Sequence, residues 1–168
     1  LDLTGKTAIV TGGSGQLGRT MVRTLSDCGA NIAIHYNNNN TQADLLVKEL
    51  EAKGRIAISV QADITNYDSV INMRDKVVSA LGNPDIILNN AVIQYEWKSV
   101  LEQDFKDYQS QFDSCVMQNV YMAKAFLPNM IKNNYGRFIA INTECSMLAE
   151  ENCSAYVAGK RGLDGLIR

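Results

Sequence analysis

The sequence predicts an α/β protein with a parallel, doubly wound sheet in a three-layer α/β/α arrangement. Short apolar, β-branched runs recur along the 168 residues, and amphipathic helical patterns separate them. A glycine cluster joins the first run to the first helical pattern. Strands that alternate with helices imply right-handed crossovers, which make neighbouring strands parallel and cover both faces of the sheet. Residues 1–168 show no repeat and no domain linker, so we expect one domain.

The first unit runs from a strand through a glycine-rich turn into a helix. Thr7–Thr11 has the apolar, β-branched character of a short buried strand. Four glycines follow it, Gly12, Gly13, Gly15 and Gly18, and the next apolar residues recur at helical spacing, at Leu17, Met21, Leu25 and Cys28. Free backbone N–H groups and the helix dipole favour an anion at a helix start, and glycines let the main chain approach it. The unit therefore predicts a Rossmann-type site for a dinucleotide.

The rest of the chain continues the alternation of strands and helices. Further strands are expected at Asn31–His35, Ile56–Gln61, Asp85–Asn89 and Arg137–Thr143. Helices are expected at Thr41–Lys53, from Thr65 or Asn66 to Leu81, from Phe105 to Asn133 with an interruption at Pro128, and from Ser154 onward. In such sheets ligands collect beyond the carboxyl ends of the strands. The residues that follow each strand are therefore expected to decide function.

Composition excludes several classes of function. The formal charge of −2 gives no bias toward nucleic acid or an anionic membrane, and no apolar run approaches the length of a membrane span. The first residues lack the pattern of a signal peptide, and the four cysteines lack metal-ligand spacing, so we expect reduced thiols in the cytoplasm and no metal. His35 is the one histidine, which argues against Ser-His-Asp hydrolysis. It ends a predicted strand, and a structural role is expected for it.

These motifs resemble the short-chain dehydrogenase/reductase family, from about residue 4 to the end of the chain. The residues that carry the resemblance are Thr11–Gly18, Asp63-Ile64, Asn89-Asn90-Ala91, Asn119 and Tyr156-x-x-x-Lys160. Tyr-x-x-x-Lys alone is a common chance match, whereas five marks in order on the expected elements are specific. The resemblance implies an oxidoreductase that interconverts a ketone and a secondary alcohol, similar to 3-oxoacyl reductases and sugar or polyol dehydrogenases. It also implies a homotetramer built on the long helices.

Tyr156 and Lys160 are the expected acid–base pair. They are four residues apart on a predicted helix, so their side chains share a face. An ordinary tyrosine, with a pKa near ~10, is a poor base at neutral pH, and a neighbouring ammonium lowers that pKa. The resemblance implies that Tyr156 exchanges a proton with the substrate oxygen. It implies that Lys160 lowers the phenol pKa and holds the nicotinamide ribose.

Two further catalytic residues follow from the resemblance. The family's serine at the end of the fifth strand corresponds to Thr143, thirteen residues before Tyr156. Its hydroxyl can donate the same hydrogen bond, although its methyl group restricts the side chain. Ser146 is a competing candidate at a different spacing from Tyr156. Asn119 matches the asparagine that supports a water in a proton relay with the lysine.

The predicted cofactor is NADP in preference to NAD. A carboxylate after the second strand would bind the ribose of NAD, but His35-Tyr36-Asn37-Asn38 holds none; the arginine or lysine that would clamp a 2′-phosphate is also missing. Asp63 resembles the residue that contacts the adenine amine. The full set expected to bind the cofactor is Gly12, Ser14, Gly15, Gln16, Leu17, Gly18, Asn37, Asp63, Ile64, Asn90, Ala91, Tyr156 and Lys160.

Three departures from the family pattern keep other functions open. Gln16 and Gly15 give the glycine spacing of the branch that acts on nucleotide sugars, which favours an epimerase or reductase of such sugars as an alternative. Gln16, Thr143 and Val92, which replaces a usual glycine, are compatible with a non-catalytic nucleotide-binding regulator. The sequence ends partway along the helix that carries Tyr156, so a C-terminally incomplete domain is expected, and the isolated segment is expected to be inactive or poorly soluble.

Overall fold

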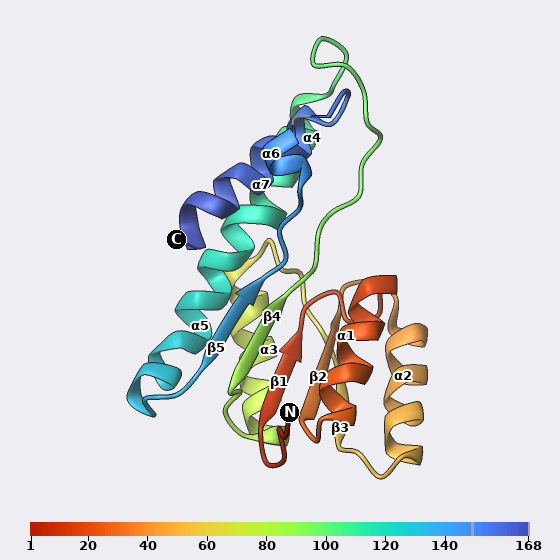
Figure 1. The fold of residues 1–168 in the computed structure, drawn as a ribbon, viewed down its shortest axis with the longest axis vertical. Helices are drawn as coiled ribbons and strands as arrows, with labels where there is room; N and C mark the ends of the chain where they lie inside the picture. Colours follow the sequence, from red (N-terminus) through yellow and green to blue (C-terminus); the bar gives the residue numbers. More distant parts are fainter. Residues whose placement is uncertain (149, 168) are drawn as a thin grey trace.

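The computed structural model describes residues 1–148 and 150–167 and confirms the predicted parallel sheet. Five parallel strands lie in the order β3-β2-β1-β4-β5 (Figure 1). Their bounds are β1 Thr7–Val10, β2 Asn31–Tyr36, β3 Ala57–Gln61, β4 Ile86–Asn89 and β5 Arg137–Ala140. Because the chain order reverses on either side of β1, the sheet has its switch point between β1 and β4.

Helices cover both faces of this sheet. Their bounds are α1 Gln16–Asp27, α2 Asn40–Ala52, α3 Tyr67–Leu81, α4 Phe105–Phe112, α5 Gln118–Lys132, α6 Cys145–Leu148 and α7 Ser154–Ile167. Strand residues alternate between two cores: Ala8 and Val10 pack toward α1 and α2, whereas Ile9 packs toward α3 and α5. The three-layer arrangement is therefore confirmed.

The long helix expected at Phe105–Asn133 is divided. A π-helical turn, η1, spans Asp113–Met117 between α4 and α5. Pro128 lies inside α5 without ending it. The π turn adds a residue to the helix repeat and so rotates the side chains that follow it, and such turns are frequent at functional sites. Periodicity in the sequence does not reveal it, because apolar residues recur on both sides of the turn.

Two other boundaries differ from the sequence prediction. The fifth strand ends at Ala140 rather than at Thr143, because its neighbour β4 ends at Asn89. The last hydrogen bond between the two segments runs from the Ile141 N–H to the Asn89 carbonyl, at 2.9 Å. The short helix α6, at Cys145–Leu148, was not expected. Both differences lie at the carboxyl edge of the sheet, where the chain leaves regular structure.

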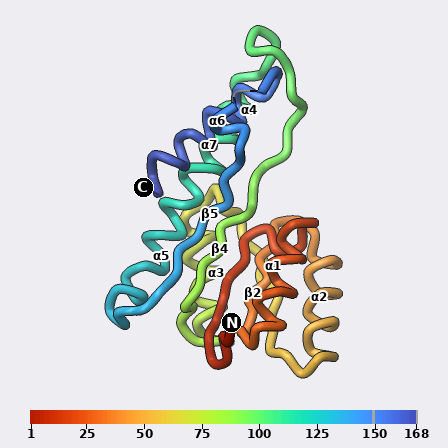
Figure 2. The backbone as a smooth tube through the Cα atoms, viewed as in Figure 1, coloured from red at the N-terminus to blue at the C-terminus, as the bar shows by residue number. Residues whose placement is uncertain are grey.

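The segment that follows β4 and the helices α4, α6 and α7 extend beyond the carboxyl ends of the strands (Figure 1). Figure 2 shows this segment rising from β4 to the tip of the molecule before the chain returns through α4. The elements that carry the predicted catalytic residues therefore stand over the same edge of the sheet as the glycine-rich turn. Among the helices of the described residues, none is long and apolar enough to cross a bilayer.

Candidate active site

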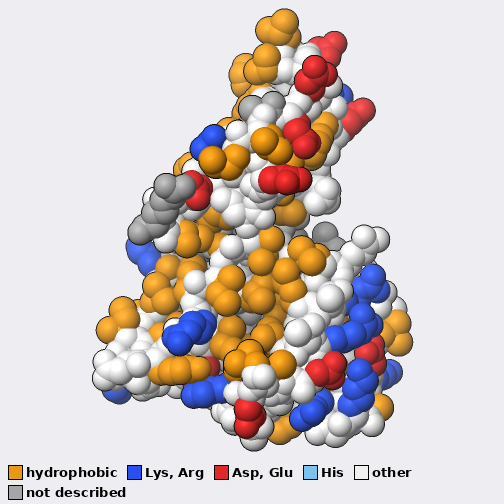
Figure 3. All heavy atoms as spheres, in the orientation of Figure 1, with side chains coloured by type: hydrophobic (Ala, Val, Ile, Leu, Met, Phe, Trp, Pro, Cys, Tyr) orange, Lys and Arg blue, Asp and Glu red, His pale blue; other side chains and the backbone are white. Residues whose placement is uncertain are grey.

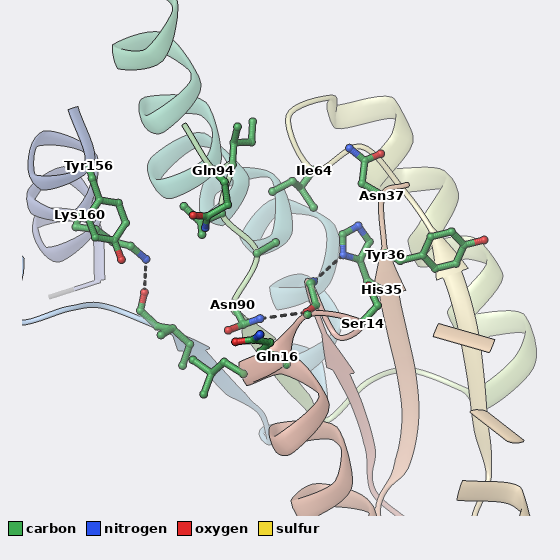
Figure 4. Close-up of a pocket in the computed structure, with 18 residues that line it drawn as sticks. Ser14, Gln16, His35, Tyr36, Asn37, Ile64, Asn90, Gln94, Tyr156 and Lys160 are labelled. Atoms are coloured by element: carbon green, nitrogen blue, oxygen red, sulfur yellow. Dashed lines mark hydrogen bonds between the residues drawn. The ribbon is translucent and has the colours of Figure 1, made fainter. Parts of the chain in front are cut away.

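An elongated cleft of about 630 Å³ runs along the carboxyl ends of β1, β2 and β4. Tyr156 and Lys160, both on α7, stand at one end, and Tyr36 and Asn37, at the end of β2, stand at the other (Figure 4). The glycine-rich turn after β1 lies between these ends. The cleft therefore places the predicted acid–base pair and the predicted nucleotide-binding turn in one site.

The glycine-rich turn leaves room for a ligand because two of its glycines, Gly12 and Gly18, stand where the Cβ of any other residue would clash or be strained. Gly12 has φ +63°, and a Cβ there would lie 3.0 Å from the Ala91 Cα. A Cβ on Gly18 would collide with the Gly12 carbonyl oxygen and lie 2.8 Å from the Gly13 Cα. These glycines let α1 pack against the turn and expose backbone N–H groups at the start of α1. The geometry fits the pyrophosphate of a dinucleotide.

The Thr11 hydroxyl ties the glycine-rich turn to the segment after β4. It accepts the backbone N–H groups of Asn90 at 2.9 Å and Ala91 at 3.0 Å. The Asn90 amide donates back to the Thr11 carbonyl at 3.0 Å. Thr11 in turn donates to the side chain of Gln118, whose amide donates to the Ala91 carbonyl at 2.9 Å. The side chains of Thr11 after β1, Asn90 after β4 and Gln118 in α5 thus hold the floor of the cleft in one arrangement.

His35 supports the same turn from below, which agrees with the structural role expected for it. Its Nδ1 accepts the Gly12 N–H at 3.0 Å, so its Nε2 carries the proton and donates to the Ala62 carbonyl at 3.0 Å. Burial lowers the pKa of His35 to about 4, partly opposed by its hydrogen bond to Ala62 and the nearby charge of Asp63. The imidazole is therefore neutral at physiological pH and binds two backbone groups at once.

The Tyr156 phenol is half-buried at the end of the cleft, and its pKa is raised above the ordinary value. Burial is the main cause, and a hydrogen bond with the Thr143 side chain partly offsets it. Lys160 is not among the groups that set the direction of this pKa shift, so the lowering of the phenol pKa by Lys160 stays a prediction. The Lys160 ammonium donates to the Ile141 carbonyl at 2.6 Å and stands 5.7 Å from the centre of the Tyr156 ring.

Lys160 is buried, with 5% of its surface exposed, and burial lowers its pKa. Its Nζ points from α7 toward the end of β5, where the Ile141 carbonyl fixes it (Figure 4). The sequence prediction that Tyr156 and Lys160 share one face of a helix is confirmed, because both line the cleft. A cation in this position can donate hydrogen bonds to a ribose that occupies the cleft.

Thr143 and Asn119 lie beside the cleft rather than in its lining. The Thr143 hydroxyl accepts the Cys145 N–H at 3.3 Å and hydrogen bonds with the Tyr156 side chain. The competing candidate, Ser146, is buried and donates its hydroxyl to the Thr143 carbonyl at 2.7 Å. Asn119 follows the π turn and donates to the Cys115 carbonyl at 2.8 Å, while its buried Oδ1 has no hydrogen-bond partner among the described residues. An orphaned acceptor of this kind suits a proton relay.

Most of the residues predicted to bind the cofactor line the cleft: Gly12, Ser14, Gly15, Gln16, Leu17, Gly18, Asn37, Ile64, Asn90, Ala91, Tyr156 and Lys160. Asp63 does not, because its carboxylate accepts the N–H and hydroxyl of Thr65, at 2.9 and 2.7 Å. Sequence reasoning missed Gln118 as a support of the binding site and Ile93, Gln94 and Ile141 as lining residues, whereas Thr11 and Val92 lie in segments that it expected to decide function. A glutamine inside an apolar helical pattern was the one available sign of Gln118.

Known proteins share both the sequence pattern and the fold of this chain. The profile described as short chain dehydrogenase matches residues 6–168. A 3-oxoacyl-(acyl-carrier-protein) reductase of Staphylococcus epidermidis is 28% identical over 97% of this chain. The chain spans 66% of the length of that relative.

Two solved structures superpose closely on this chain. A blue fluorescent protein from a metagenomic library, in complex with NADPH, gives a TM-score of 0.90 at 33% identity, covering 99% of this chain and 67% of its own. A 7α-hydroxysteroid dehydrogenase, complexed with NADH and a 7-oxo bile acid conjugate, gives 0.92 at 25% identity, covering 98% and 64%. With the profile match over nearly its whole length, the chain belongs to the short chain dehydrogenase family.

Proposed function

We propose that the protein is an NAD(P)-dependent oxidoreductase that interconverts a ketone and a secondary alcohol. One observation carries the proposal: Tyr156 and Lys160 share a cleft with a glycine-rich turn built to hold a dinucleotide phosphate. A bound nicotinamide dinucleotide would supply a hydride to the carbonyl carbon, or accept one from the alcohol. The chain's own residues then have to manage the proton at the substrate oxygen.

Tyr156 is suited to supply that proton during reduction. Because burial raises its pKa, the phenol keeps its proton at neutral pH and can give it to the oxygen that gains charge as the carbonyl is reduced. Thr143, whose hydroxyl hydrogen bonds with Tyr156, is the proposed second donor to that oxygen. In oxidation the phenolate takes the proton back, so oxidation is expected to accelerate as pH rises toward the phenol pKa and reduction to slow.

Lys160 and Asn119 provide a route by which the phenol regains its proton. The Lys160 ammonium is held by the Ile141 carbonyl within reach of the cleft, and burial lowers its pKa, which eases proton release. The buried Oδ1 of Asn119, unpartnered within residues 1–148 and 150–167, can accept a hydrogen bond from a relay water. Both residues act on Tyr156 and on the ribose end of the cleft rather than on the substrate carbon.

The proposal is tested by ketone-dependent oxidation of NADPH by the full-length protein across a panel of ketones. Tyr156→Phe removes only the hydroxyl, and turnover is expected to fall by about 10²–10⁴-fold, as for loss of a general acid, with cofactor affinity retained. Tyr135→Phe is the matched control, because that ring lies over the Lys6 ammonium, remote from the cleft. Cofactor binding without turnover of any ketone in the wild type would instead support a non-catalytic regulator.

We propose NADP as the preferred cofactor. Tyr36 and Asn37 line the cleft at the end of β2, where an acidic residue would repel a 2′-phosphate, and Ser14 lines it nearby with a hydroxyl donor. Among the described residues that line the cleft, Lys160 is the one cation, and it stands at the opposite end. Titration of the protein with NADPH and with NADH tests this proposal. Asn37→Asp is expected to weaken NADPH binding and spare NADH binding, whereas tighter NADH binding by the wild type would contradict it.

The nucleotide-sugar alternative is less well supported. It depends on the glycine spacing created by Gly15 and Gln16, whereas the matching profile is that of short chain dehydrogenases over residues 6–168. Gln16, the first residue of α1, lines the cleft together with its neighbours Gly15 and Leu17, so it does not close the cleft to a ligand. Activity on simple ketones but not on nucleotide sugars is the expected outcome of a substrate panel.

A cytoplasmic homotetramer is the proposed state of the protein. The four cysteines are free thiols, which suits a reducing compartment. The helices α4 and α5 expose large apolar side chains, Phe105 at 93%, Phe112 at 47% and Ile131 at 71% exposure, as expected of helices that pack against another subunit. Analytical ultracentrifugation of the full-length protein tests the tetramer, and a monomer at micromolar concentration would contradict it.

A further inference from the structure

The post-β4 segment, residues 90–104, has no regular secondary structure, yet it is firmly anchored. The fully buried Gln111 donates to the Ile93 carbonyl at 2.7 Å. Gln103 accepts the Lys98 N–H at 2.9 Å and donates to the Glu96 carbonyl at 3.1 Å. Side-chain amides thus satisfy the backbone of this segment in place of a sheet or helix ladder. The aromatic residues between these anchors are therefore held in defined positions.

Two of these aromatic residues, Trp97 and Tyr95, contact Tyr156. The Trp97 ring stacks on the Tyr156 ring, with centres 6.0 Å apart and planes inclined by 27°. The Tyr95 hydroxyl accepts the Tyr156 backbone N–H at 2.9 Å. Tyr156 lies in the first turn of α7, where backbone N–H groups have no partner within the helix. The post-β4 segment thus contacts the catalytic tyrosine at both its ring and its backbone.

We propose that Trp97 and Tyr95 are positioning residues for the acid–base step, and this inference rests on the proposed function of Tyr156. The Trp97 indole limits rotation of the phenol and shields one face of its ring from water. The Tyr95 hydroxyl fixes the height of the Tyr156 backbone along α7. Neither residue is among those that line the cleft, so neither has to contact the cofactor. Their effect reaches the reaction through the orientation and solvation of the phenol.

Kinetic measurements on the full-length protein test the proposal. Trp97→Ala is expected to lower kcat at least tenfold with little change in KM or in NADPH affinity, and Trp97→Phe is expected to restore most of kcat because it keeps a stacking ring. Tyr95→Phe is expected to lower kcat severalfold. Tyr135→Phe is the matched control, because this aromatic residue lies against the Lys6 ammonium, away from the cleft lining, and its loss of a hydroxyl is expected to leave kcat unchanged.

A titration separates this proposal from the proposed function, because it requires no turnover. Carbon-13 NMR of labelled tyrosine, with the Tyr156 signal assigned by its loss in Tyr156→Phe, follows the phenol directly. Trp97→Ala is expected to move the Tyr156 titration to lower pH, since the ring becomes more accessible to water. An unchanged titration and a kcat within twofold of wild type would overturn the proposal. A shifted titration in a protein that binds NADPH but reduces no ketone would uphold the positioning contact and refute the proposed activity.

Discussion

Thr143 is a half-buried residue just beyond the end of β5, and its hydroxyl has two partners. It accepts the Cys145 N–H at 3.3 Å, and it hydrogen bonds with the Tyr156 side chain. A threonine differs from the serine of the resembled pattern by one methyl group, which restricts rotation about χ1 and so favours a fixed hydroxyl. The sequence spacing and the structure therefore favour Thr143 over Ser146, whose hydroxyl is committed to the Thr143 carbonyl.

Thr143→Val is predicted to remove most turnover while leaving cofactor affinity nearly intact. The substitution keeps the shape of the side chain and deletes the hydroxyl that hydrogen bonds with the phenol, and loss of one such donor at a developing oxyanion costs about 10²–10³-fold in kcat. Steady-state kinetics with an NADPH titration provide the measurement. Thr143→Ser, which keeps the hydroxyl, is expected to retain activity, and undiminished turnover in Thr143→Val would refute the assignment.

His35 makes stability depend on pH. Its pKa is about 4 in the folded chain and near 6.5 in the unfolded chain, so between these values the unfolded chain binds more protons. The stabilisation by neutral His35 is complete above pH 6.5 and is lost as pH falls toward 4, by about 3 kcal/mol in all. Urea unfolding across this range is predicted to show that slope in the wild type. In His35→Gln the slope is expected to diminish; an identical slope in both would contradict the prediction.

At the scale of elements, α7 is the helix on which the site depends, and a glycine sets its position. A Cβ on Gly159 would lie 2.8 Å from the Gln111 carbonyl oxygen and 3.2 Å from the Cys115 Cβ. Because the nearer neighbour is backbone in α4, it cannot rotate away. The close contact of α7 with α4 and the π turn is what carries Tyr156 and Lys160 to the cleft.

Gly159→Ala is predicted to destabilise the fold by about 1–3 kcal/mol, as overpacking typically does, and to lower kcat because α7 has to shift. Gly165→Ala is the matched control on the same helix, since its Cβ would meet no atom of the described residues within 4 Å outside the backbone of α7. That control is expected to be neutral or more stable, because alanine favours helix over glycine. Thermal unfolding and kcat for both variants test the pair. Equal effects of the two substitutions would contradict the role of helix packing.

The elements themselves were largely predictable, because each depends on local pattern. The five strands and the helices that cover the sheet follow from apolar periodicity, and Asn66 caps α3 as one of the two expected candidates, accepting the Ser69 N–H at 2.9 Å. The π turn at Asp113–Met117 and the helix α6 were not predictable. Their conformations are decided by contacts with α7 and β5, which lie far along the chain. The same reason hid the contacts of Gln118 with Ala91 and of Trp97 with Tyr156, because the two partners in each contact lie far apart along the chain.

On the scale of the whole molecule, β5 forms one edge of the described sheet, and β3 forms the other. The exposed residues of β5 are the charged Arg137 and the apolar Ile139. Ile139 is 42% exposed, and Leu166 and Ile167 at the end of α7 are each 44% exposed. Hydrophobic side chains gather over the middle of the face seen in Figure 3, while acidic side chains gather on the upper part. An unpaired strand edge beside apolar surface favours association between chains.

The exposed apolar residues at this sheet edge predict that the 168-residue chain self-associates. Ile139→Lys places a charge on the edge strand and is expected to reduce association, as charged residues on natural edge strands do. Light scattering as a function of concentration measures the difference. Lys132→Ala changes a charge outside the strand and serves as the control. A wild-type chain that stays monomeric over the same concentration range would contradict the prediction.

The hydroxyl of Thr11 has a consequence for how the cleft moves. Because it accepts the N–H groups of both Asn90 and Ala91, two amides that lie outside the strands are shut off from bulk water. Their deuterium uptake should match that of the central strands β1 and β4 rather than that of the loops beside them. The side of the cleft formed by the glycine-rich turn, Asn90 and Ala91 is then rigid. Any opening and closing of the cleft has to come from movement of α7 at its other end.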